Sequence, residues 1–467
     1  MLQFAAMSLV EEKVQASDEG LLRALGLGSA ILLVVGTVIG SGIFLTTGVM
    51  AQAIPSASLL LLAWILGGVL TIAGGLTYAE MGAMFPRSGG VYVFLREAYG
   101  PLPAFLYGWA SLLVVISGAT AAVAVGFADY LSYFVPALST SRVVVALAVP
   151  WGEYTISAAQ LAAALSLAVL GAVNYVGVRS GNMVNVVLTA AKVGGLAAIP
   201  VMALIAGSVA PAYTPVVPAE VVRPLAAFGV AMIAVLWTYE SWYYVTYAAG
   251  EIRDPHRNVP RALVIGILIL MGIYVTVNVA YLHAMTIDEM RGVTRIAERA
   301  ATTLMGPGGA TFIALTVVLS TLGCNAAGLL GGSRVLFAMA KDGVFLPAAS
   351  RVHTRYRTPH IAITALTTWA IVLTLSGTYE QLFTYVMFAS ILFSVATGLA
   401  LFRLRATRPE HPRPYRAWGY PWVPALYVLG ASAFVLNTLV ERPFESMFGL
   451  GIVLTGIPVY LAQRRTA

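Results

Sequence analysis

The sequence contains few charged residues, one cysteine and five histidines, and these shortages exclude several classes of protein. Only 10% of the 467 residues are charged, whereas 59% are hydrophobic and the mean hydropathy is +0.85. A soluble domain is roughly 45–50% apolar and about 25% charged. A soluble fold, a disordered chain and a coiled coil are therefore excluded, and we expect the lipid bilayer to surround most of the chain.

The single cysteine, Cys324, permits no internal disulfide and lies in an apolar stretch, so we expect no disulfide-linked partner subunit. The histidines are scattered, and neither an HExxH nor a GxSxG motif occurs. We therefore expect no enzyme activity, no bound metal and no cofactor. The net charge of +7 could suggest a nucleic-acid partner, but in an apolar chain the basic residues are better explained as topology signals.

Apolar segments bounded by charge, proline or glycine recur along the whole chain, and each approaches the roughly 20 residues that a helix needs to cross a bilayer. The sequence thus predicts an all-α membrane protein with twelve transmembrane helices. They are expected near 26–52, 57–84, 101–135, 157–177, 183–207, 225–250, 261–285, 308–340, 359–377, 380–402, 423–440 and 446–462.

The distribution of Lys and Arg predicts the orientation of these spans. With the amino terminus inside, 20 basic residues fall on the inner side, six fall outside and Lys192 lies within a span. This imbalance predicts a multi-pass protein of the plasma (inner) membrane with both termini in the cytoplasm. The basic cluster Arg403–Arg416 either anchors this topology or binds anionic lipid.

The first span contains a weak helical stretch from Gly36 to Gly42, Gly-Thr-Val-Ile-Gly-Ser-Gly, at the centre of segment 26–52. Each glycine inside a helix costs about 1 kcal/mol relative to alanine. Gly36 and Gly40 alone would suit close helix packing as a GxxxG pair. The additional Ser41 and Gly42 favour a real break, because irregular backbone is tolerated at membrane depth where it lines a cavity.

The sixth span carries a carboxylate near its centre, in Trp237-Thr238-Tyr239-Glu240-Ser241. A carboxylate at this depth costs on the order of 2.5–3.5 kcal/mol. One interpretation of Glu240 is a structural ion pair. The polar neighbours Thr238 and Ser241 favour another, an unwound backbone around water or a ligand.

The two weak positions lie five spans apart, which predicts an inverted repeat of five plus five helices whose broken helices meet at the midplane. A broken helix offers N–H groups on one half and C=O groups on the other, which suit the carboxylate and the ammonium of a zwitterionic amino acid. The expected organisation is a cytoplasmic segment 1–25, repeats 26–207 and 225–402, a basic cytoplasmic loop 403–422, two further helices in 423–462 and a cytoplasmic end 463–467.

Lys192 lies about ten residues into the fifth span, roughly 15 Å deep at 1.5 Å per residue. Snorkelling to the interface is the alternative, and the depth disfavours it. The eighth span has small polar residues from Ser320 to Asn325, which serve either packing or ligand binding. A fixed ammonium beside hydroxyls and free carbonyls can take the place of a bound sodium ion. Glu80, near the inner end of the second span, is expected to meet a donor from a loop.

Several motifs resemble those of the amino acid–polyamine–organocation permeases over nearly the whole chain. Gly36–Phe44 resembles the GxxIGSGIF signature of that superfamily, and Pro86–Tyr92 and Gly250–Arg261 resemble its loops after spans two and six. Trp237–Trp242 is similar to the FAYDGW segment of the L-type amino acid transporter branch, and Gly456–Tyr460 also resembles that branch.

The resemblance implies the leucine-transporter fold, with helices 1 and 6 unwound, and sodium-independent exchange of L-amino acids by alternating access. It implies that the substrate carboxylate binds the N–H groups of Ser41, Gly42 and Ile43. The substrate amino group would bind the carbonyls of Val38, Trp237 and Glu240, with Trp237 as the outer gate. Lys192 would occupy a sodium position near Ser320 and the carbonyls of Val35 and Gly36. Asn325 is a further candidate for the side-chain pocket.

Two residues depart from the branch. Glu240 is longer than its usual Asp or Gly and could attract a cationic side chain, and Trp237 is bulkier than its usual phenylalanine. The predicted function is an amino acid exchanger in which Lys192 replaces sodium. The alternatives are a proton-coupled symporter in which Lys192 or Glu240 cycles a proton, a channel, and an amino acid sensor that transports nothing.

Overall fold

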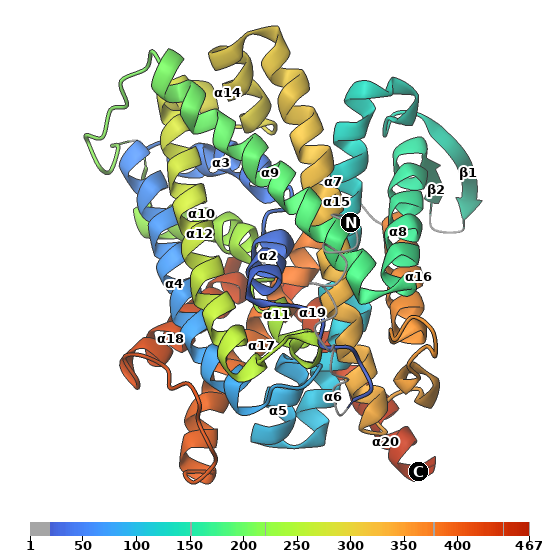
Figure 1. Cartoon of the computed structure of the whole chain (residues 1–467). Helices are drawn as coiled ribbons and strands as arrows, with labels where there is room; N and C mark the ends of the chain where they lie inside the picture. The colour runs from blue at the N-terminus through green and yellow to red at the C-terminus, as the bar shows by residue number, and fades with distance from the viewer. Residues whose placement is uncertain (1–18, 150–151, 220, 377–378, 442, 467) are drawn as a thin grey trace, which may run out of the picture.

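The computed structural model describes residues 19–149, 152–219, 221–376, 379–441 and 443–466, which form a bundle of long helices (Figure 1). The helices and strands are α2 (Leu27–Val38), α3 (Gly42–Ala53), α4 (Ala57–Met84), α5 (Val91–Tyr99), α6 (Pro101–Ala110), the π-helix η1 (Ser111–Val115), α7 (Ile116–Phe134), β1 (Val143–Val149), β2 (Gly152–Ser157), α8 (Ala158–Val176), α9 (Val178–Ala206), α10 (Pro224–Tyr239), α11 (Tyr244–Tyr247), α12 (Pro255–Ala284), α13 (Ile287–Met290), α14 (Ile296–Met305), α15 (Pro307–Lys341), α16 (His360–Ser376), α17 (Tyr379–Thr407), α18 (Trp422–Glu441), α19 (Pro443–Leu454) and α20 (Gly456–Thr466).

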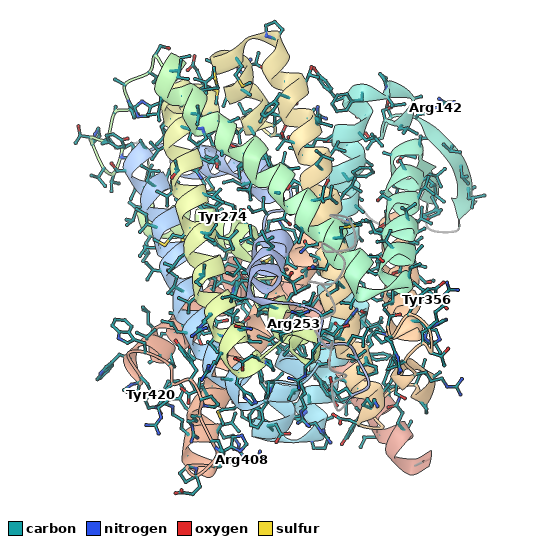
Figure 2. The ribbon with its side chains drawn as sticks, viewed as in Figure 1. Arg142, Arg253, Tyr274, Tyr356, Arg408 and Tyr420 are labelled. Atoms are coloured by element: carbon teal, nitrogen blue, oxygen red, sulfur yellow. The ribbon has the colours of Figure 1, made fainter. Side chains whose placement is uncertain are left out.

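The helices confirm a multi-pass membrane architecture. Within the described residues, ten helices are long and apolar enough to cross a bilayer, and the bent pair α2 and α3 gives an eleventh if it is counted as one span. The helix α16 is apolar but has only 17 residues. Figure 2 places Arg142 at one end of the bundle and Arg408 at the other. We call the end that carries Arg87, Arg96, Arg405 and Arg408 the basic end.

Several helix boundaries differ from the predicted ones for local reasons. The helix α12 starts at Pro255, within the predicted loop, because proline fits the first helical turn, where its missing N–H is not needed. The helix α17 continues to Thr407, so the predicted loop 403–422 is helical at its start. The helix α8 starts where predicted, with a capping box in which Ser157 and Gln160 bond to each other's backbone N–H groups.

The β-hairpin of β1 and β2 departs from the all-helical prediction. Its antiparallel register pairs Ala146 with Thr155 and Leu147 with Tyr154. The strand β1 reads Val-Val-Val-Ala-Leu-Ala-Val, and such β-branched residues favour strands over helices. Figure 1 shows the hairpin at the edge of the bundle beside α8, where the Tyr154 hydroxyl donates to the Leu375 carbonyl at 2.8 Å.

The interrupted helix α2 lies in the middle of the bundle (Figure 1). It packs against α9, α12 and α15, and α3 packs against α10. The helices α12 and α15 both pack against α9 as well. The break between α2 and α3 is therefore surrounded by protein, the setting in which non-helical backbone is tolerated at membrane depth.

Candidate substrate site

The first span breaks between Val38 and Gly42, inside the predicted stretch. The axis bends by 42° between α2 and α3, and the Gly40 N–H turns back to the Val38 carbonyl at 2.8 Å. Gly36 is required by close packing, because a Cβ at this position would lie 2.4 Å from the Asn185 side-chain oxygen on α9. Glycines at this break therefore have two roles: they permit the irregular backbone, and they allow α9 to pack closely.

The sixth span breaks between α10 and α11, over residues 240–243. Ser241 has a φ of 74°, which places it in the left-handed region, and Glu240 is extended. The predicted break began earlier, but Trp237, Thr238 and Tyr239 remain helical, and the Trp237 carbonyl accepts the Glu240 N–H at 3.0 Å. The two breaks touch, since the Thr37 hydroxyl donates to the Ser241 carbonyl at 3.1 Å.

The Lys192 ammonium is fully buried and donates to carbonyl oxygens at the first break. Its Nζ lies 2.8 Å from the Gly36 oxygen, 2.6 Å from the Ile39 oxygen and 3.3 Å from the Ser320 oxygen. The Ser320 hydroxyl adds donations to the Ile39 and Gly40 carbonyls, each at 3.0 Å. This cation thus bridges the end of α2 and the middle of α15.

The partners of Lys192 differ from the predicted set at one position. The Val35 carbonyl accepts the Ile39 N–H at 3.1 Å, the last regular bond of α2. Ile39 supplies the carbonyl instead, because the chain leaves the helical path after Val38 and turns this oxygen toward α9 and α15. Gly36 and Ser320 lie where they were expected.

A cavity, which we call the main cavity, lies between the two breaks, α7 and α15. Its lining contains six of the predicted residues, namely Val38, Ser41, Gly42, Trp237, Glu240 and Asn325. Ile43 does not line it and is fully buried. Gly42 lies at the start of α3, where the N–H groups of the first turn lack helical acceptors. This helix end suits an anionic group.

The main cavity is also lined by polar side chains that were not individually assigned to it from the sequence, among them Thr37, Thr120, Tyr244 and Cys324. The Cys324 thiol contacts the Thr37 carbonyl at 3.0 Å. The Asn325 amide, oriented to satisfy both of its polar atoms, donates to the Thr120 carbonyl at 3.2 Å and accepts the Ala124 N–H at 3.3 Å. Asn325 therefore joins α15 to α7 behind the cavity surface.

The Glu240 carboxylate accepts hydrogen bonds from the hydroxyls of Tyr243 and Ser390. No Lys or Arg in the described residues forms an ion pair with it, which disfavours the structural ion pair, the alternative interpretation of Glu240, in this part of the chain. The Glu240 carboxylate therefore has two hydroxyl donors but no cationic partner among the described residues, so it is available to a cationic ligand. In the described residues no group of three or more His, Cys, Asp or Glu side chains has a metal-binding arrangement.

Three polar side chains of α12, which were not predicted from the sequence, hold both halves of the broken helix. The Tyr274 hydroxyl lies 3.3 Å from the Val38 oxygen and 3.0 Å from the Thr238 oxygen, and Figure 2 shows Tyr274 at mid-height beside α2. Asn278 accepts the Thr47 hydroxyl at 2.7 Å. Tyr281 donates to the Ile43 carbonyl at 3.1 Å. Their i, i+4, i+7 spacing on one apolar helix is the signal that could have found them.

Comparison with known proteins defines the class of protein that carries this site. The chain matches the family described as amino acid permease over residues 25–455, and it belongs to that family. The protein is therefore an amino acid permease with a multi-pass membrane architecture.

Individual relatives are similar along almost their full length. The serine/threonine exchanger SteT of Bacillus subtilis (strain 168) is 32% identical over 455 residues, which covers 97% of this chain and 99% of the exchanger. The b(0,+)-type amino acid transporter 1 of Homo sapiens is 30% identical, with 96% and 90% covered. The large neutral amino acids transporter small subunit 2 of Mus musculus is also 30% identical, with 96% and 83% covered.

Proposed function

We propose that the chain is a sodium-independent amino acid exchanger in which the Lys192 ammonium stands where a sodium ion would bind. The observation that carries this proposal is the contact of Lys192 with the carbonyls of Gly36, Ile39 and Ser320. These oxygens come from α2 and α15, whose relative movement would have to open and close the cavity. The Lys192 ammonium, which is covalently part of the chain, stabilises these carbonyl oxygens so that no dissociable sodium ion is needed.

The substrate binds in the main cavity as a zwitterion. Its carboxylate lies at the start of α3, on the N–H groups of Ser41 and Gly42, which line the cavity, and the helix dipole there favours negative charge. Its ammonium lies at the carbonyl ends of α2 and α10, at Val38, Trp237 and Glu240. Trp237, which lines the cavity, closes above the substrate as the gate.

The remaining proposals concern the whole chain. We count twelve spans by taking α2 with α3 as the first and α16 as the ninth, arranged as two inverted five-helix repeats and two further helices. The protein lies in the plasma membrane with both termini in the cytoplasm. Cys324, the sole cysteine of the sequence, lines the main cavity, so the transporter works without a disulfide-linked subunit.

The decisive experiment measures exchange in proteoliposomes that are preloaded with unlabelled amino acid. We use external L-threonine first, because the Bacillus relative is named for it, and then the other amino acids. Uptake that depends on internal amino acid supports exchange. Uptake into empty vesicles driven by a pH gradient supports the proton-coupled alternative, for which the unpaired Glu240 carboxylate is the candidate group, and binding without flux supports a sensor.

The role of Lys192 is tested by Lys192→Ala in the same assay. We expect exchange to fall at least ten-fold, because three carbonyls lose a cationic donor. Lys341→Ala, at the exposed end of α15, removes an equal charge and should leave exchange unchanged. Normal exchange by a monodisperse Lys192→Ala protein would reject the sodium-like role.

A further inference from the structure

A second cavity lies behind the Glu240 carboxylate, between α4, α10, α17 and α18. We call it the side cavity, and its lining includes Thr71, Glu240, Trp242, Ser394, Tyr427 and Ala431. Of these residues Glu240 alone also lines the main cavity. The carboxylate therefore forms part of the wall between two separate spaces.

The negative charge of the Glu240 carboxylate is not balanced by a Lys or Arg among the described residues. Glu240 receives two hydroxyl hydrogen bonds, and no cationic side chain among the described residues pairs with it. A carboxylate at membrane depth is costly unless a cation or a proton accompanies it. A ligand with a positive charge can supply that cation from either cavity.

The other walls of the side cavity suit a planar or aromatic organic cation. Trp242 and Tyr427 lie nearly perpendicular to each other, with ring centroids 6.4 Å apart. Aromatic faces attract guanidinium and ammonium groups. The hydroxyls of Thr71 and Ser394 add acceptor oxygens, since Thr71 uses its proton on the Gly67 carbonyl at 2.7 Å.

The surroundings of the side cavity indicate where such a ligand comes from. Leu66 and Val69 on α4 and Leu426 and Leu429 on α18 are exposed large apolar residues close in sequence to the lining residues of these helices. In a membrane protein these side chains face lipid. The exposed apolar surface beside the side cavity therefore favours a ligand with an apolar body.

We propose that the side cavity is a binding site for an amphiphilic organic cation, an alkyl or aryl ammonium or guanidinium, which pairs with Glu240 from the side opposite the substrate. This site is additional to the proposed exchange site. Because the two cavities share one carboxylate, the ligand excludes a cationic amino acid side chain from Glu240. It leaves the backbone groups that hold a neutral amino acid untouched.

The test uses benzylguanidine as the probe and the full chain in lipid nanodiscs, with binding measured by calorimetry. We expect saturable binding that weakens at least ten-fold in Glu240→Gln, where the charge-assisted pair is lost. Ala431→Phe fills the side cavity and should abolish binding. Leu429→Phe, two residues away and exposed on the same helix, is the matched control and should bind as the wild type does.

Competition separates the two cavities. Saturating L-threonine should change the dissociation constant of benzylguanidine by less than two-fold. Displacement of the probe by L-threonine, with full binding to Ala431→Phe, would place it in the main cavity and overturn the proposal, as would the absence of binding. The binding readout needs no flux, so it stands or falls independently of the exchange assay.

Discussion

Two side chains from helices outside the breaks, Lys192 and Tyr274, reach the carbonyl oxygens that the broken helices expose. Lys192 carries a charge and bonds oxygens of α2 and α15, whereas Tyr274 is neutral and bonds oxygens of α2 and α10. A buried carbonyl without a donor costs free energy comparable to a lost hydrogen bond. Each residue therefore fixes one junction of irregular backbone and thereby shapes the cavity.

The Tyr274 hydroxyl is expected to support substrate binding. Tyr274→Phe removes the one hydroxyl proton that the carbonyls of Val38 and Thr238 share, which is worth about 0.5–1.5 kcal/mol, and frees the ends of α2 and α10 to shift. We expect the KM for exchange to rise roughly ten-fold. Tyr133→Phe, whose hydroxyl bonds Thr311 at an exposed site, is the control and should leave KM unchanged. Equal KM values for both variants would contradict the positioning role of Tyr274.

The Glu240 carboxylate is expected to set the charge preference of the substrate side chain. Glu240→Gln keeps the size and the hydrogen bonds but removes the charge, so the ratio of exchange with L-arginine to exchange with L-threonine should fall at least ten-fold. The measurement is competition of each amino acid against labelled substrate. An unchanged ratio would show that the carboxylate serves only Tyr243 and Ser390.

At the scale of elements, the position of each break follows from local composition, whereas the partners of the break do not. Three glycines and a serine identify the first break, and Lys192 was recognised from its depth in an apolar span. Tyr274 and Tyr281 carry no comparable local signal, since aromatic side chains are common in membrane helices. Their role depends on which face of α12 meets α2, and this is set by tertiary packing that a single sequence does not encode locally.

The same distinction explains the two misplaced features. The Val35 carbonyl was expected at Lys192, but only coordinates reveal that α2 keeps its regular bonding as far as the Ile39 N–H. The hairpin segment is short, rich in valine and located between two spans, so its pattern alone does not separate a strand from a loop. The path of the backbone at Val35 and the element type of the hairpin segment therefore both depend on tertiary contacts.

The contact between α3 and α10 is expected to limit the size of residue 42. In Gly42→Ala the new Cβ would lie 2.7 Å from the Thr238 hydroxyl and 3.1 Å from its Cβ, which forces the two broken helices apart. We expect exchange to fall more than ten-fold and stability to fall by about 1–3 kcal/mol. Gly28→Ala, also in the first span but with nothing within 4 Å, should be neutral or stabilising by up to about 1 kcal/mol.

At the scale of the whole molecule, ion pairs at the basic end join the segment that follows α17 to the rest of the bundle. Arg408 pairs with Glu97 of α5, and Arg405 and Arg413 pair with Glu80 of α4. The Glu80 carboxylate is fully buried and also accepts the Ala417 N–H at 2.7 Å, the loop donor that its position predicted. Three arginines of the basic cluster, Arg405, Arg408 and Arg413, thus pair with carboxylates of the protein itself.

The two carboxylates of the basic end should contribute very differently to stability. Glu80→Gln leaves Arg405 and Arg413 without their charge partner beside a buried site, and breaking a buried pair costs about 3 kcal/mol or more. Glu97 is the control, because its partners Arg87 and Arg408 are exposed and a surface pair contributes about 1 kcal/mol or less. We therefore expect Glu80→Gln to lower the Tm in detergent markedly and Glu97→Gln to leave it almost unchanged. Equal Tm values for the two variants would mean that Glu80 does not hold the bundle and the segment after α17 together.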